Sequence, residues 1–196
     1  MRGRWSSVVA LAAGIAVGAA SPAGAQVTGC PYRAGSDPSA RPSPLDSVML
    51  KVAGSDVKVC YGRPSARGRT MIGGENVPFG QVWRTGANET TKIMSAAALQ
   101  VGGIEVPAGM HALYTVPGES EWQIIVNRSH EQWGAERTYS DEVKAQELGR
   151  ATVKVERVDN HIETFTIRSE PGADGSASLV LEWEHTRVRV PITVTK

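Results

Sequence analysis

Apolar residues occupy every second position in two stretches near the C-terminus, 179–183 and 188–194, and most of the positions between them are polar or charged. A period of two places successive side chains on opposite faces of a β-strand. Both stretches are therefore predicted to be strands with one apolar and one solvated face, as in an antiparallel sheet.

Shorter apolar runs bounded by turn residues predict the remaining strands. Residues 48–52 and 57–61 flank a turn at Gly54, and residues 99–101 and 104–106 flank Gly102-Gly103, a typical two-residue hairpin turn. The other predicted strands are 92–94, 111–116, 122–126, 151–158 and 162–167. Turns that recur about every eight to twelve residues are typical of a sandwich or barrel.

Helical signals are confined to one region between these strands. Ser129 and Gln132 fit the S-x-x-Q capping pattern, and residues 141–148 predict two helical turns that end at Gly149. The predicted fold class is therefore mainly β, an antiparallel, jelly-roll-like β-sandwich with one or two short helices.

The N-terminal segment indicates export. Arg2 and Arg4 precede a 13-residue apolar run, 8–20, and Ala23-Gly24-Ala25 fits an A-x-A cleavage site. The run is shorter than the ~20 residues that a membrane-spanning helix needs. We therefore predict a signal peptide over 1–25, a flexible Pro- and Ser-rich arm over 26–46 and a single β-sandwich domain over 47–196, located in the periplasm or secreted.

The charge of the remaining chain excludes some partners. Removing Arg2 and Arg4 leaves 19 basic and 20 acidic residues, a net charge of −1. A nearly neutral chain has no electrostatic basis for binding nucleic acid or anionic membranes. We therefore expect no nucleic-acid partner and no transmembrane segment.

Two cysteines, Cys30 and Cys60, would enter an oxidising compartment, where a disulfide between them is the plain expectation. An alternative is a lipid anchor on Cys30, because residues 27–30 resemble a bacterial lipobox. Six residues separate that tetrad from the apolar run, so the A-x-A site is the better-placed cleavage signal.

The loop between the first hairpin and the strand at 92–94 holds the densest chemistry. Its residues 83–91 combine an aromatic, a cation, an amide and a carboxylate, and Gly86 and Asn88 suit positive φ. A connection this long in a compact domain usually has a function. We predict a polar pocket lined by Tyr61, Arg63, Arg84, Asn88 and Glu89.

Other candidate chemistry is weaker. Glu182 and Glu184 share a predicted strand face about 7 Å apart, which fits a glycosidase pair, but charges on a wet strand face more often only solvate it. The four histidines have no metal-ligand spacing, so no metal and no cofactor are predicted. Trp133, near a loop, is the best candidate for stacking on a sugar.

Several of these segments together resemble a known family, the domain-of-unknown-function family 2911, over roughly residues 45 to 195. The resemblance is carried by residues 61–64, 67–69, 77–80, 82–91, 107–109 and 132–134. It implies a bacterial, extracytoplasmic protein and implies no reaction. Met110-His111 departs from the family pattern, in which an aromatic residue with a small neighbour is expected.

Three functions fit these observations. The first is a binding module for a small polar or anionic ligand, such as a saccharide, and it is preferred over catalysis. The second is a hydrolase that uses Glu89 as general acid or base with Arg84 tuning it. The third is a structural envelope protein in which the 83–91 segment only stabilises the fold.

Overall fold

The computed structural model describes residues 29–32, 37–133 and 138–195; the predicted signal peptide lies outside these ranges. Nine strands form one antiparallel sheet in the order β1-β2-β3-β6-β7-β8-β9-β4-β5. The strands are β1 Leu45–Val52, β2 Ser55–Gly62, β3 Thr91–Ser95, β4 Leu99–Val101, β5 Ile104–Val106, β6 Gly109–Val116, β7 Glu121–Asn127, β8 Glu147–Pro171 and β9 Ala177–Val194. The predicted mainly β, antiparallel fold is confirmed, and its jelly-roll-like detail stays a prediction.

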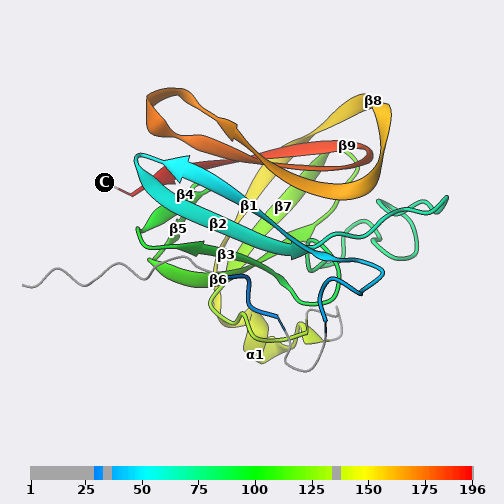
Figure 1. The fold of residues 1–196 in the computed structure, drawn as a ribbon, viewed down its shortest axis with the longest axis horizontal. Helices are drawn as coiled ribbons and strands as arrows, with labels where there is room; N and C mark the ends of the chain where they lie inside the picture. The colour runs from blue at the N-terminus through cyan, green and yellow to red at the C-terminus, as the bar shows by residue number, and fades with distance from the viewer. Residues whose placement is uncertain (1–28, 33–36, 134–137, 196) are drawn as a thin grey trace, which may run out of the picture.

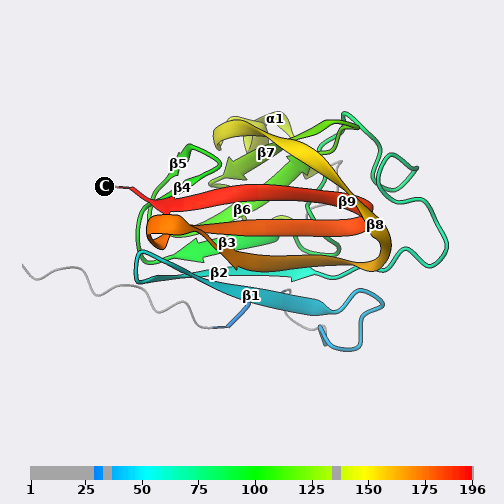
Figure 2. The ribbon, with the colours of Figure 1, turned by 90° about the horizontal axis from the view of Figure 1, so that it is seen from above.

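Two layers arise because β8 changes partner along its length. Its first part pairs with β7 up to Lys154, and from Val155 onward it pairs with β9. The sheet therefore folds over itself, and the β8–β9 hairpin covers the layer that contains β2, β3 and β6 (Figures 1 and 2). The core lies between the layers, with Val59 and Ile93 from one and Leu181 and Val188 from the other all buried.

The hairpin turns match the sequence expectation closely. Ala53 and Gly54 connect β1 to β2, and Gly102 and Gly103 connect β4 to β5. All four have positive φ, from 46° to 92°, as a two-residue turn that follows the strand twist requires.

The helical prediction is only partly correct. Helix α1 covers Asp141–Lys144, with the Ser140 side chain accepting from the Val143 N–H at its N-terminus. Residues 147 and 148 belong to β8, where Gly149 pairs with Val126, so sheet pairing overrides their helical propensity. Ser129 and Gln132 do hydrogen-bond to each other at 3.0 Å, but no helix begins there within the described residues.

The predicted break between separate strands at 151–158 and 162–167 is also absent. Residues 151–158 and 162–167 belong to the single strand β8, whose register against β9 shifts between Arg157 and Thr166. The polar residues 159–161 continue the strand, because β8 pairs with β9 both before and after them. In addition, the short helix η2, Ala173–Gly175, connects β8 to β9.

A disulfide joins Cys30 to Cys60, as predicted, with 5.7 Å between the Cα atoms. It fixes the N-terminal arm to β2. Within the described ranges, no helix has the length and apolar character needed to cross a bilayer.

Candidate functional site

Trp83 connects the 83–91 segment to the core. Its backbone exchanges two hydrogen bonds with Thr115 of β6, at 2.7 and 3.0 Å, and its indole N–H donates to the Gly86 carbonyl at 3.1 Å. The ring stacks on Trp183 of β9, with 5.8 Å between centroids. The aromatic residue of this motif is therefore a core residue that holds the loop in place.

Close backbone packing explains the glycines on either side. A Cβ at Gly62 would lie 2.0 Å from the Ala87 carbonyl oxygen, and one at Gly86 would lie 2.8 Å from the Gly62 oxygen. Asn88 has φ of 65°, as its sequence position suggested. The loop therefore turns back against the end of β2 only because these positions carry no side chain or tolerate positive φ.

The five predicted site residues lie in three different surroundings. Tyr61 is in the core, where its oxygen accepts from the Ile167 N–H at 3.0 Å, and burial raises its pKa to about 12. Arg63 donates to the Thr166 hydroxyl at 3.0 Å and lies 3.5 Å from the Asp46 carboxylate. Tyr61 at the end of β2 and Arg63 just after it are therefore both bonded to β8.

Arg84 and Asn88 line a cavity of about 420 Å³, which we call the polar loop cavity. Arg84 donates to the Asn88 carbonyl at 3.0 Å, and the Asn88 amide donates to the Ser43 carbonyl at 2.9 Å. Arg69 also lines it and donates to the carbonyls of Ser65 and Ala66. These hydrogen bonds are all to backbone oxygens, so the side chains hold the loop together.

Glu89 faces a second cavity, of about 430 Å³, which we call the Lys92 cavity. Both of its carboxylate oxygens accept from Arg41 of the arm, at 2.5 and 3.0 Å. Arg41 also lies over the Trp133 ring, 5.8 Å from its centroid. Arg41 and Glu89 are each only 11% exposed in their side chains, so the arm and the loop meet in a largely buried ion pair.

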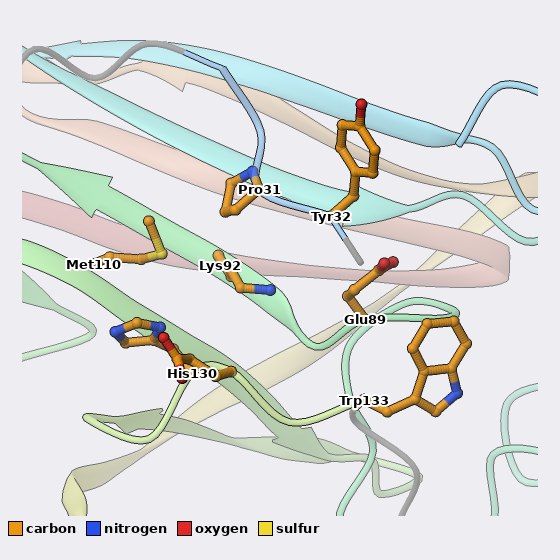
Figure 3. A pocket seen from close by; sticks show the side chains of 8 residues that line it. Pro31, Tyr32, Glu89, Lys92, Met110, His130 and Trp133 are labelled. Atoms are coloured by element: carbon orange, nitrogen blue, oxygen red, sulfur yellow. The ribbon is translucent and has the colours of Figure 1, made fainter. Parts of the chain in front are cut away.

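The Lys92 cavity combines apolar walls with ionisable groups (Figure 3). It is lined by Pro31, Tyr32, Glu89, Lys92, Met110, His130, Glu131 and Trp133. Its volume is within the range of small-molecule sites, and a few polar groups among apolar and aromatic side chains are typical of such sites. Trp133, the predicted stacking residue, is 37% exposed at this cavity.

Lys92 is the most unusual residue in this lining. It lies on β3, which is paired with β2 on one side and β6 on the other and whose residues are all buried. The whole of Lys92 is 5% exposed. In the described part of the chain its amine makes one hydrogen bond, a long one of 3.4 Å to the Thr90 carbonyl. Burial lowers its pKa, and the charges of Glu89 and Glu131 oppose that shift without cancelling it.

Two histidines are close to this cavity. His130 lines it, and its Nδ1 is buried without a hydrogen-bond partner in the described residues. His111 on β6 is 6% exposed, and burial, followed by His130 and Arg128, lowers its pKa. Its neighbour Met110, the other residue that departs from the family pattern, lines the cavity wall.

Glu182 and Glu184, whose spacing fits a glycosidase pair, are both bound to other groups of the protein. Glu182 is bound by Arg168 and Arg187 on the outer face of β8 and β9. Glu184, with φ of 53°, accepts from the backbone N–H groups of Met71 and Ile72 at 3.0 and 2.8 Å. Across the residues that the structure describes, no three His, Cys, Asp or Glu side chains are grouped as metal ligands.

Lys92 and Arg41 are the residues that sequence reasoning missed. Lys92 sits in a predicted strand between Thr91 and Ile93, and a lysine in a central strand was the available signal. Arg41 has no such signal, since it lies in a Pro- and Ser-rich stretch.

The fold and this cavity define a mainly β, disulfide-bonded protein with a small-molecule-sized cavity between its arm, its long loop and its sheet. The chain belongs to the family described as "Protein of unknown function (DUF2911)", whose model matches residues 43–192. No curated protein and no solved structure matches the chain.

Proposed function

We propose that the protein is a bacterial, extracytoplasmic binding protein for a small anionic ligand, and that the ligand occupies the Lys92 cavity. The apolar run and A-x-A site of residues 1–25 and the Cys30–Cys60 disulfide support this location. The Lys92 cavity is preferred to the polar loop cavity because Arg84 and Arg69 there already bind loop carbonyls.

The buried Lys92 amine carries this proposal. An ammonium group has three donors, and its burial is costly when it makes one long hydrogen bond among the described residues. The charges of Glu89 and Glu131 offset part of that cost without cancelling it, and both oxygens of Glu89 are already bound by Arg41. A carboxylate entering the cavity would supply a counter-ion and short, charge-assisted hydrogen bonds.

The walls favour an anion with a flat apolar body over a saccharide. Pro31, Tyr32, Met110 and Trp133 offer mainly apolar surface, and Arg41 lies over the Trp133 ring. The alternative of a hydrolase with Glu89 as general base is less favoured, because a carboxylate in a bidentate pair with Arg41 is a poor proton acceptor.

The test uses benzoate as the probe and calorimetry as the measurement. Benzoate should bind the wild-type protein, and Lys92→Met should weaken binding about tenfold or more, since a hydrogen bond to a charged group contributes roughly 1.5–3 kcal/mol. Lys51→Met is the matched control, because Lys51 is 71% exposed and pairs with Asp56 on the β1–β2 hairpin. It should leave benzoate affinity unchanged.

The pH dependence provides a second readout. Because burial lowers the pKa of Lys92 from 10.5, benzoate affinity should fall as the pH rises through that lowered value. Equal benzoate affinities for wild type and Lys92→Met, or binding of benzamide as tight as benzoate, would contradict the proposal. Turnover of a chromogenic ester that is abolished in Glu89→Gln would instead favour the hydrolase.

A further inference from the structure

We propose that the Lys92 amine also reacts covalently, capturing small aldehydes or ketones in the Lys92 cavity as a reversible imine. This inference rests on the cavity of the proposed function. It adds an activity to it, because imine formation requires the neutral amine whereas anion binding requires the ammonium.

The position of Lys92 makes its nitrogen available to a bound molecule. Lys92 pairs in register with Cys60 of β2 and Ala112 of β6, so the three side chains share one face of the sheet. Figure 3 shows the amine directed along the cavity towards Glu89. With one 3.4 Å hydrogen bond to the Thr90 carbonyl, the nitrogen is held loosely and can approach a carbonyl carbon.

Burial raises the fraction of the Lys92 amine that is neutral. Burial lowers the pKa of Lys92 more than Glu89 and Glu131 raise it. Glu89 is paired with Arg41 from the arm, which weakens its support for the ammonium. The other ionisable groups that line the cavity are Tyr32 of the arm and His130 beyond β7.

The cavity also selects the class of carbonyl compound. Its volume of about 430 Å³ accommodates a small ring, and Tyr32, Trp133, Pro31 and Met110 supply apolar walls for it. A small aromatic or short aliphatic aldehyde or ketone matches these walls because most of its own surface is apolar.

The reaction is balanced without an added reagent. The nitrogen lone pair attacks the carbonyl carbon, the carbonyl oxygen gains a proton and the nitrogen loses one, which gives a carbinolamine. Loss of its oxygen as water then leaves the C=N bond, and addition of water reverses the step. Glu131, which lines the same cavity and is exposed to solvent, is placed to accept and return the proton.

The experiment treats the disulfide-bonded protein with benzaldehyde and cyanoborohydride and locates the benzylated lysines by peptide mass spectrometry. Lys92 should be labelled faster than the exposed Lys51 at neutral pH, because its lowered pKa leaves a larger fraction of its amine neutral. Labelling of Lys92 should also begin at lower pH than labelling of Lys51. Labelling of Lys92 no faster than Lys51 would overturn the proposal.

Benzoate separates this proposal from the binding function. Added benzoate should protect Lys92 from benzaldehyde and leave Lys51 unprotected. If benzoate binds through Lys92 but no benzyl adduct forms there, the imine proposal alone fails. If the adduct forms and benzoate neither binds nor protects, the anion-binding function fails while imine formation stands.

Discussion

At the scale of single residues, the carboxylate of Glu89 has a partner that its neighbours in sequence do not reveal. Arg84, five positions earlier, binds the Asn88 carbonyl, whereas Arg41 of the arm donates to both Glu89 oxygens. Burial makes this pair sensitive to change, because removing one partner leaves the other charge uncompensated in a poorly solvated place.

We therefore expect Arg41→Met or Glu89→Gln to lower the free energy of unfolding by about 3–5 kcal/mol each, while the double variant loses less than the sum. Urea unfolding of the four proteins measures this difference. Lys51→Met is the control, because the exposed Lys51–Asp56 pair should contribute less than about 1 kcal/mol. An unchanged unfolding midpoint in Glu89→Gln would show that the pair does not stabilise the fold.

At the scale of elements, the β8–β9 hairpin has a ladder of ion pairs on its outer face. Glu182 lies between Arg168 and Arg187, and Glu170 lies between Arg168 and Arg189. The Arg168–Glu182 and Arg189–Glu170 pairs join the two strands, and such cross-strand pairs help to set the register of strands whose pairing is interrupted between Arg157 and Thr166.

This ladder predicts loss of stability in acid. Hydrogen bonds from Arg189 and then Arg168 lower the pKa of Glu170 from 4.5 to about 2. Because the folded pKa is depressed, the contribution of Glu170 is fully present above about pH 5 and is lost as the pH falls towards 2. Melting temperatures of wild type and Glu170→Gln should differ at pH 7 and converge near pH 2.

High salt provides a further check on the ladder. The difference between wild type and Glu170→Gln should shrink at 1 M salt because both side chains of the pair are 34% exposed and the Debye length falls to about 3 Å. A difference that stays constant from pH 7 to pH 2 would rule out a contribution from the charge of Glu170.

At the scale of the whole molecule, the Lys92 cavity is assembled from distant parts of the chain. Pro31 and Tyr32 follow directly on the Cys30–Cys60 disulfide, Lys92 lies on β3, and Trp133 lies beyond β7. The disulfide holds the arm against β2 at the strand position that pairs with Lys92. The cavity wall therefore depends on the oxidised disulfide.

Intact mass spectrometry of the exported protein should show a chain that begins at Gln26 and lacks two hydrogens because of the disulfide. Reduction of the disulfide should add the two hydrogens back. It should also expose Lys92 to acylating reagents. A mature chain that begins at a lipid-modified Cys30 would contradict this prediction, since a thioether sulfur cannot also form the disulfide.

The sequence alone determined the strands and the turns. Alternation at 179–183 and 188–194 and the glycines at 54, 102 and 103 are local signals, because a strand's faces and a turn's φ depend on neighbouring residues. The end of α1 and the continuity of β8 were misjudged, since β7 and β9 supply pairing energy that local propensity does not contain.

Only the tertiary structure decided which side chains meet. The sequence indicated that Arg84, Asn88 and Glu89 belong to one turn, but the turn directs Arg84 and Asn88 to the polar loop cavity and Glu89 to the Lys92 cavity. Arg41, Lys92 and Trp133 meet Glu89 because β-sheet pairing and a disulfide bring segments together irrespective of their separation along the chain. Periodicity records which face of its own strand a residue occupies and carries no information about what covers that face.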